Sequence, residues 1–560
     1  MSKLSIYQVF PRLFGNTNTT NKHNGTIDEN GCGKFNSFTS KALQEIKSLG
    51  ITHVWYTGII EHATQTDYSA FGIRKDHPGV VKGKAGSAYA IKDYYDVDPD
   101  LAEDVENRMT EFENLVKRTH KAGMKVIIDF VPNHVAREYH SDAKPAGVID
   151  LGENDHSEWA FSPLNNFYYI PNQPFNPQFD AKGYIEFPAR ATGNDQFTSS
   201  PTQNDWYETV KLNYGINYVE GHQKQFYPIP DTWYKMRDIL LFWTSKNIDG
   251  FRCDMAEMVP VEFWSWAVSQ VKLKYPKIIF IAEVYQPSEY RNYLCNGKFD
   301  YLYDKVGLYE TLRNITSRNF PARDITNSWQ SLGGIENQML NFLENHDEQR
   351  IGSGFFCGNG ISAQPAMIVS ATLTQAPVMI YSGQELGELG MDSEGFSGTD
   401  GRTTIFDYWG VKSIQAWNNG GKFNNDKLTQ DQKDLRAFYQ KLLNTALTEK
   451  AITNGLMYDL EFANFDNPKF NSHKQYAYFR KFEDELLLIV LNFDDKHLDT
   501  EVRLPREVFQ YFELKEDQNY RVANLLNETS KFPMVTLNSK EPFVAHIPAW
   551  KGFILKLTKV

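Results

Sequence analysis

Over most of its length the chain alternates between amphipathic segments and short apolar runs. Segments 40–50, 108–123, 231–247 and 260–276 have the spacing of helices with one apolar face, and an apolar run follows each. Gly50 and Gly123 stand where the first two helices should end. Apolar runs of this kind are typical of strands buried on both faces of a parallel sheet. The pattern therefore predicts repeated helix, turn and strand units.

The number of apolar runs indicates the architecture. Eight apolar runs occur along the chain. The weakest of them contains FDYLYD, residues 299–304. Eight parallel strands alternating with helices close into a (β/α)8 TIM barrel, so we predict an α/β fold of this kind. The predicted strands lie within residues 4–13, 53–60, 125–135, 248–256, 277–285, 299–304, 338–347 and 376–385.

Two regions interrupt this rhythm. Residues 136–230 are rich in Asn, Pro, Gly and aromatic residues without helical periodicity, which predicts a domain inserted after the third strand. Beyond a helix predicted at 430–447, the tail alternates apolar and polar residues in short runs, as an antiparallel β-sandwich does. We therefore expect the barrel in 1–135 and 231–450, the insertion in 136–230 and the β-sandwich in 451–560.

Charge and hydropathy exclude several classes of partner. The chain has 58 basic and 70 acidic side chains, a net charge of −12, without the Lys/Arg runs that bind nucleic acid or anionic membranes. It also lacks an apolar stretch of about 18 residues, and its start lacks the apolar core of a signal peptide. We expect a cytoplasmic protein with no nucleic-acid or membrane partner.

The cysteines indicate no metal or redox centre. They are widely scattered and contain no CxxC pair, so we expect free, buried thiols in a reducing compartment. They are Cys32, Cys253, Cys295 and Cys357.

Two charged residues stand in a predicted strand whose side chains should be buried away from water. Residues two apart in a strand share a face, so Arg252 and Asp254 both point into the barrel. An arginine beside a buried carboxylate lowers its pKa, and we expect Asp254 to remain an anion. For this pair taken alone, a structural ion pair is the more common interpretation.

Other predicted strands also end in ionisable residues. Glu283 ends one apolar run, and His346 and Asp347 end another. Because the strands of such a barrel end at one mouth, three carboxylates should meet there. Two carboxyl groups about 5 Å apart form the machinery of a retaining glycosidase, a nucleophile opposite a general acid.

Four ordered segments, DFVPNHV, GFRCDMAEM, IAEV and FLENHD, resemble the α-amylase family of glycoside hydrolases. The resemblance implies the same barrel, an inserted domain B and a C-terminal β-sandwich. It also implies that Asp254 is the nucleophile, Glu283 the acid/base and Asp347 the stabiliser of the transition state. Arg252 would orient Asp254 and keep it charged.

The resemblance extends to residues around these carboxylates. It implies that His134 and His346 bind the sugar ring before the scissile bond and that Tyr89 stacks on that ring. It further implies that Asp129 is structural. Asn133 would be a ligand in those relatives that bind calcium between barrel and domain B.

The chain departs from the family pattern at two places. Glu257 and Met258 stand where many relatives have Lys and His, which touch the sugars beyond the scissile bond, so we expect unusual acceptor contacts. Lys211 and Asn213 flank Leu212 where an acidic residue is usual. Since calcium prefers several oxygen ligands, we do not expect a tight calcium site, and no other cofactor is implied.

The resemblance favours retaining hydrolysis of α-1,4 bonds in malto-oligosaccharides or related α-glucans. A transglycosylase, of the 4-α-glucanotransferase or sugar isomerase type, uses the same residues and remains the alternative. A noncatalytic binding module is disfavoured because Asp254, Glu283 and Asp347 are all present. The sequence does not decide linkage preference, endo or exo action, or oligomeric state.

Overall fold

A closed barrel of eight parallel strands forms the centre of the protein. The computed structural model describes residues 3–218, 220–527, 529 and 532–560. Neighbours around the barrel follow the order β1-β2-β5-β12-β13-β14-β15-β16, and β16 pairs with β1. Each predicted apolar run contributes one strand, so the predicted fold is confirmed. The strands are β1 (Ser5–Val9), β2 (His53–Tyr56), β5 (Lys125–Phe130), β12 (Gly250–Cys253), β13 (Ile279–Ala282), β14 (Tyr301–Tyr303), β15 (Met339–Phe342) and β16 (Val378–Tyr381).

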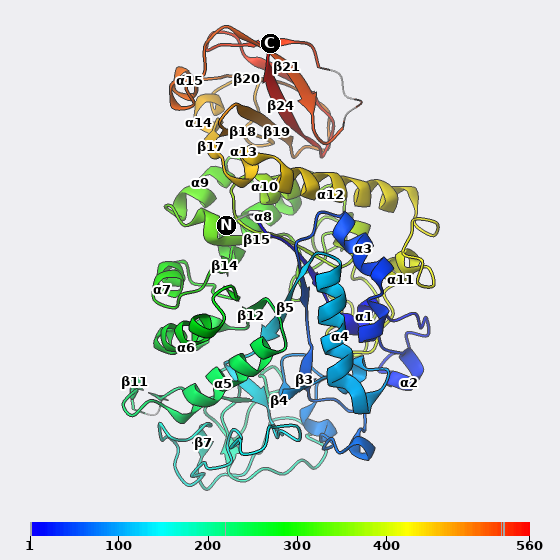
Figure 1. Cartoon of the computed structure of the whole chain (residues 1–560), viewed down its shortest axis with the longest axis vertical. Helices are drawn as coiled ribbons and strands as arrows, with labels where there is room; N and C mark the ends of the chain where they lie inside the picture. Colours follow the sequence, from blue (N-terminus) through cyan, green and yellow to red (C-terminus); the bar gives the residue numbers. More distant parts are fainter. Residues whose placement is uncertain (1–2, 219, 528, 530–531) are drawn as a thin grey trace.

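Helices surround the barrel, and the predicted ones form within two residues of their expected ends (Figure 1). Thr39 accepts a hydrogen bond from the Ala42 amide and so caps the first of them. Gly50 and Gly123 follow their helices with φ of +90° and +77°, a region that glycine enters without steric cost. The longer helices are α3 (Ser40–Ser48), α4 (Arg108–Lys121), α5 (Asp231–Ser245), α6 (Val261–Lys274), α8 (Glu310–Arg318), α9 (Asp324–Ser331), α10 (Gln364–Thr372) and α12 (Gln430–Thr448).

Shorter elements fill the connections. An antiparallel pair of strands, β3 with β4, follows the second barrel strand, and short helices lie between the longer ones. These elements are β3 (Ile60–His62), β4 (Ile91–Val97), α1 (Pro11–Phe14), α2 (Ile27–Asn30), α7 (Tyr290–Cys295), α11 (Lys412–Asn418) and α13 (Lys450–Thr453).

The segment between β5 and α5 is mostly loop with three short antiparallel pairs. Arg137, fully buried, organises it: its guanidinium contacts Glu186 at 2.8 Å and donates to the carbonyls of Tyr207 and Thr209. This buried cation thus supplements the small apolar cluster that the segment forms around Phe175. The pairs are β6 (His134–Ala136) with β9 (Thr209–Lys211), β7 (Tyr169–Ile170) with β8 (Ala189–Arg190), and β10 (Ile216–Asn217) with β11 (Gln223–Lys224).

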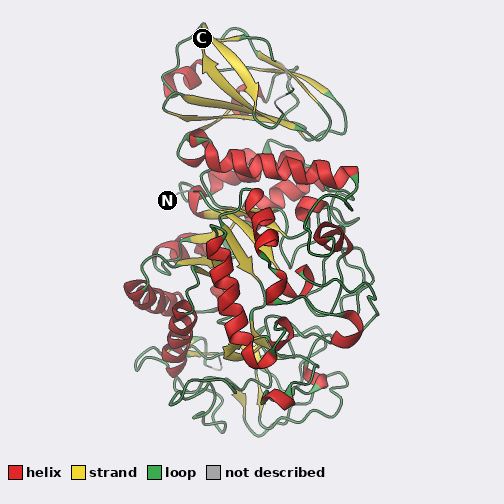
Figure 2. Ribbon diagram, turned by 45° about the vertical axis from the view of Figure 1, so that its right-hand side comes forward, coloured by secondary structure: helices red, strands yellow, loops and turns green. Residues whose placement is uncertain are grey.

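The C-terminal part contains a six-stranded and a two-stranded antiparallel sheet, which lie beyond the long helix α12 (Figure 2) and contact the barrel helix α10 through β24. These sheets and the inserted segment lie at opposite ends of the long axis (Figure 1). The strands and helices are β17 (Leu456–Asp459), β18 (Gln475–Phe482), β19 (Glu485–Asn492), β20 (Leu498–Val502), β21 (Gln518–Asn524), β22 (Val535–Leu537), β23 (Phe543–Ile547), β24 (Gly552–Lys559), α14 (Glu461–Asn464) and α15 (Arg506–Tyr511).

The cysteine prediction is confirmed in one respect and wrong in another. All four thiols are free, but only Cys253 is buried, on β12; Cys32 and Cys357 are half-buried. Cys295 is exposed because it ends the short helix α7 at the surface. Among the described residues, no helix is long and apolar enough to cross a membrane.

Candidate active site

The three predicted carboxylates lie where barrel strands end. Asp254 directly follows β12, Glu283 directly follows β13, and Asp347 lies in the loop after β15. The amide of Asp254 donates to Phe130 and that of Glu283 to Cys253, which continues the strand ladders by one residue. Because β12 and β13 are neighbours, Asp254 and Glu283 are held side by side.

Arg252 connects the two carboxyl groups. Its Nη1 lies 2.6 Å from Asp254 Oδ1, and its Nη2 lies 2.8 Å from Glu283 Oε2. The Tyr303 hydroxyl accepts from its Nε at 3.1 Å. The planar fork of one guanidinium thus positions both groups, which a point charge could not do.

The net shift of the Asp254 pKa is opposite in direction to the predicted lowering. Burial raises the pKa of Asp254 well above that of an ordinary aspartate; Arg252 lowers it and Glu283 raises it. The influence of Arg252 has the predicted sign. Burial and the charge of Glu283 outweigh it, because one guanidinium is shared by two carboxyl groups in a buried site.

Glu283 is surrounded by donors. Its Oε2 accepts from the amide of Met255 at 2.8 Å, and its Oε1 accepts from the hydroxyl of Tyr285. Tyr285 lies two residues after Glu283. The two-residue period of a strand would have been a signal for it, but the sequence analysis did not single it out.

Asp347 is held by His346 and by the loop after β16. Burial acts to raise the pKa of Asp347, but contact with His346 Nε2 at 3.0 Å, aided by Arg252 and Arg402, lowers it to about 2. On the other side of the ring, Nε2 of Gln8 lies 2.8 Å from Nδ1. Since an amide N–H donates, this contact leaves Nε2 of the imidazole to donate to Asp347.

Tyr89 and Asp129 form the floor beside these groups. The ring of Tyr89 stacks on His346 with centroids 4.9 Å apart, and its hydroxyl donates to Asp129 Oδ1 at 3.2 Å. Asp129 also accepts from Trp55 Nε1 at 3.0 Å and lies 3.4 Å from Arg252 Nη1. With both carboxylate oxygens occupied, Asp129 supports the site structurally.

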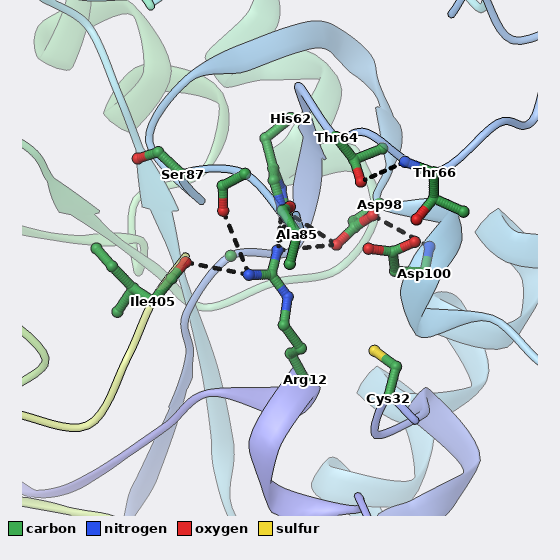
Figure 3. A network of polar contacts seen from close by, with 12 residues as sticks. Arg12, Cys32, His62, Thr64, Thr66, Ala85, Ser87, Asp98, Asp100 and Ile405 are labelled. Carbon is green, nitrogen blue, oxygen red and sulfur yellow. Dashed lines mark hydrogen bonds and ion pairs between the residues drawn. The ribbon is translucent and has the colours of Figure 1, made fainter. Parts of the chain in front are cut away.

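A buried arginine holds the loop that carries Tyr89 (Figure 3). Arg12 donates to the carbonyls of Ala85 and Ile405 at 3.0 Å each. Asp98 lies 4.0 Å from the same guanidinium and 3.3 Å from His62. Arg12 therefore ties the segment before Tyr89 to the loop after β16.

Comparisons with known proteins show the family to which the chain belongs. The family model described as "Alpha amylase, catalytic domain" matches residues 8–512. The chain belongs to the α-amylase family. Alpha-amylase 3 of Dictyoglomus thermophilum is 23% identical over 508 residues, which cover 87% of this chain and 84% of that relative.

Other members of the α-amylase family are similar to this chain in sequence or in fold. The cyclomaltodextrin glucanotransferase of Bacillus licheniformis is 21% identical over 397 residues, which cover 68% of this chain and 48% of that protein. The crystal structure of an α-amylase from Geobacillus thermoleovorans, complexed with acarbose, superposes with a TM-score of 0.63. At 18% identity over 99% of this chain and 98% of the other, it shows the shared fold.

The remaining predicted residues lie beside the mouth of this α-amylase-family barrel. His134 opens β6, and its ring lies 5.2 Å from that of Trp206, centroid to centroid. Burial, with the charge of Lys211, lowers the pKa of His134 to about 3, so the ring is neutral at neutral pH. The amide nitrogen of Asn133 donates to Gly193 at 2.8 Å. The predicted sugar-binding roles of His134, His346 and Tyr89 stay predictions.

Glu257 and Met258 line a cavity of about 380 Å³ together with Tyr218 and Tyr293; Asp254, Glu283 and Asp347 are not among its lining residues. Glu257 Oε2 accepts from the amides of Tyr285 and Gln286 at 3.0 and 3.1 Å. It is therefore a tether for the loop after Glu283 as well as part of the cavity wall. Sugar contacts at these two positions stay predictions.

Several side chains that shape the site were missed by sequence reasoning. Polar or aromatic residues inside an apolar strand run were their only signal, and such residues also occur in ordinary cores. These residues are Gln8, Trp55, Tyr303 and Arg12. Arg402, in the loop after β16, lies outside every predicted strand and has no such signal; its Nε donates to the Asp347 carbonyl at 2.6 Å.

Proposed function

We propose that the protein is a retaining hydrolase of α-1,4-glucosidic bonds in malto-oligosaccharides or related α-glucans. The observation that supports this most is that Asp254 and Glu283 form ion pairs with the two terminal nitrogens of the same guanidinium, that of Arg252. Two carboxyl groups that contact the same guanidinium lie close together. Such a short separation fits a retaining enzyme, because an inverting enzyme needs space for a water molecule between its carboxyl groups.

In the proposed first step the pair carries one proton, placed on Glu283. Glu283 donates this proton to the glycosidic oxygen, and Asp254 attacks the anomeric carbon as the bond to the leaving sugar breaks. A covalent β-glycosyl ester forms. Glu283, now ionised, then removes a proton from water, whose oxygen attacks the same carbon and releases Asp254.

The neighbours of the pair have supporting roles in this proposal. Asp347, with its pKa of about 2, is anionic at every working pH and accepts hydrogen bonds from ring hydroxyls. Tyr89 offers an aromatic face to the sugar. The solved α-amylase relative complexed with acarbose supports a malto-oligosaccharide in this mouth.

We expect Asp254→Asn and Glu283→Gln each to lower kcat/KM on maltoheptaose at least about 1,000-fold, with the far-UV dichroism unchanged. Asp300→Asn is the matched control. Asp300 is likewise next to a barrel strand, but it precedes β14 and so lies at the end of the barrel away from the mouth. Its carboxylate accepts from Lys272 at 2.8 Å and from the Phe280 amide. Wild-type turnover in either catalytic variant contradicts the assignment.

Azide distinguishes the two roles. With an activated aryl α-maltoside, Glu283→Ala still forms the ester, so azide attacks it and yields an α-glycosyl azide. Asp254→Ala leaves room for azide in place of the carboxylate and yields the β-azide. Product configuration by proton NMR reads out the result, and exchanged configurations would exchange the two assignments.

The transglycosylase alternative uses the same intermediate. The cavity beside Glu257 and Met258, and the likeness to a cyclomaltodextrin glucanotransferase, favour considering it. Thin-layer chromatography of early products from maltoheptaose separates the two functions. Chains longer than maltoheptaose at early times support transfer, and shorter chains alone support hydrolysis.

A further inference from the structure

Lys211 is a buried cation at the edge of the active site. It ends β9, and its side chain is 3% exposed. Its ammonium group lies 2.7 Å from Asp195 Oδ1 and 3.4 Å from the Met258 carbonyl, and it donates to Asn133 Oδ1. The ring of Tyr218 lies at 5.9 Å.

These oxygen atoms come from three separate parts of the molecule. Asn133 follows barrel strand β5, Asp195 belongs to the inserted segment, and Met258 belongs to the segment after catalytic strand β12. The backbone of Asn133 accepts from Leu212, and its side chain donates to Gly193. The ammonium of Lys211 thus contacts the barrel, the inserted segment and the segment after β12 that contains Met258.

The donor set is of the kind that holds a hard cation: a carboxylate, an amide carbonyl and a backbone carbonyl. The sequence resemblance names Asn133 as the calcium ligand of those relatives that bind the ion. Here the amide oxygen of Asn133 already accepts from an ammonium that also faces Asp195. A divalent ion among the same oxygens would lie against a positive charge, so calcium does not fit at this position.

The backbone around this point is constrained. Asp195 has a φ of +61°, which residues other than glycine adopt only when neighbouring contacts hold them there. A Cβ at Gly193 would lie 2.5 Å from Thr209 Oγ1 and 2.9 Å from His134 Cβ, so the loop approaches β6 and β9 as closely as glycine allows. The ion pair with Lys211 is a contact that holds this loop in place.

We propose that the ammonium of Lys211 replaces a bound divalent cation, joining the inserted segment to the barrel and fixing residues 255–260 beside the catalytic pair. The chain thereby supplies its own cation. Because Lys211 reaches the Met258 carbonyl, it also positions the segment that carries Glu257.

Thermal unfolding of the full-length protein tests this proposal. For the wild type we expect the same Tm in a chelator and in millimolar calcium chloride. Lys211→Ala removes the ammonium and opens space among the oxygens, so its Tm should fall by about 5 °C and calcium should restore at least half of the loss.

Two variants control for general damage. Lys211→Met fills the space without a charge, so its Tm should fall but should not respond to calcium. Lys3→Ala removes another buried lysine, one whose ammonium donates to two backbone carbonyls, those of Thr374 and Ala376, and should not respond to calcium either. A calcium response confined to Lys211→Ala supports the proposal.

A wild-type Tm that falls in chelator would overturn the proposal, as would a Lys211→Ala protein that calcium leaves unchanged. Limited proteolysis of Lys211→Met gives a readout that needs no reversible unfolding. We expect faster cleavage near residues 191–195 than in Lys3→Ala, and equal rates would count against the role of Lys211.

Discussion

At the scale of single residues, the charge of Arg252 governs the site. It is fully buried and contacts Asp254, Glu283 and Asp129. A buried arginine is tolerated only when its charge is paired, and here the pairing also holds together the two carboxyl groups that we propose as catalytic. Structural and chemical roles are thus inseparable in this side chain.

The pH dependence of activity should reflect this pairing. Asp254 attacks only as an anion, and burial raises its pKa, so the acidic limb of kcat/KM should lie above the ordinary aspartate value of about 4. Arg252 lowers this pKa; Arg252→Gln should therefore move the limb to higher pH by about one unit or more.

Arg252→Lys is the matched control for that measurement, because it keeps the charge and loses the fork. Its acidic limb should move less than that of Arg252→Gln, although kcat falls in both. A limb in Arg252→Gln that stays in place or moves to lower pH contradicts the charge balance derived for Asp254.

At the scale of elements, the loops that follow β12 and β13 act as one unit. Glu257, from the first loop, accepts two backbone amides of the second, and Tyr285 in that second loop donates to Glu283. Tyr293, from α7, donates to the carbonyls of Glu257 and Val259. The positions of these loops are therefore linked by hydrogen bonds to Glu283, the proposed general acid.

Glu257→Ala should lower kcat about tenfold, because two amides lose their acceptor and Tyr285 is no longer held against Glu283. Glu262→Ala is the control: Glu262 lines the same cavity, and its pair with Lys224 is exposed to solvent. Steady-state kinetics on maltoheptaose measures both variants. Equal kcat values for the two would refute the tethering role.

At the scale of the whole molecule, the C-terminal sheets share a core with the barrel. Along β18, Tyr476 and Tyr478 belong to the cluster that fills the barrel, whereas Ala477 and Phe479 belong to a separate C-terminal cluster. The strand is thus buried on both faces. Arg480 extends this junction by donating to the carbonyls of Leu373, Ala451, Ile452 and Gly455 at 2.8–3.0 Å.

Arg480→Met should lower the free energy of unfolding by about 4 kcal/mol, because four buried carbonyls lose their donor. Denaturant unfolding followed by tryptophan fluorescence and far-UV dichroism should show one shared transition. Arg503→Met, at an exposed pair with Asp466, should change the free energy by less than about 1 kcal/mol. Separate transitions for the two parts would contradict the shared core.

The sequence by itself determined the barrel, its eight strands and the convergence of Asp254, Glu283 and Asp347, because these follow from local periodicity and from the parallel direction of the strands. It also indicated an insertion after β5 and an antiparallel tail, since both interrupt the period.

Only the tertiary structure decided how charges are shared. Arg252 forms ion pairs with both Glu283 and Asp254, Lys211 lies among oxygens from three segments, and Glu257 holds the loop of Tyr285. The partners of Lys211, for example, lie between 16 and 78 residues away along the chain. No local pattern encodes such pairings, because a side chain finds its partner only once the barrel closes and excludes water.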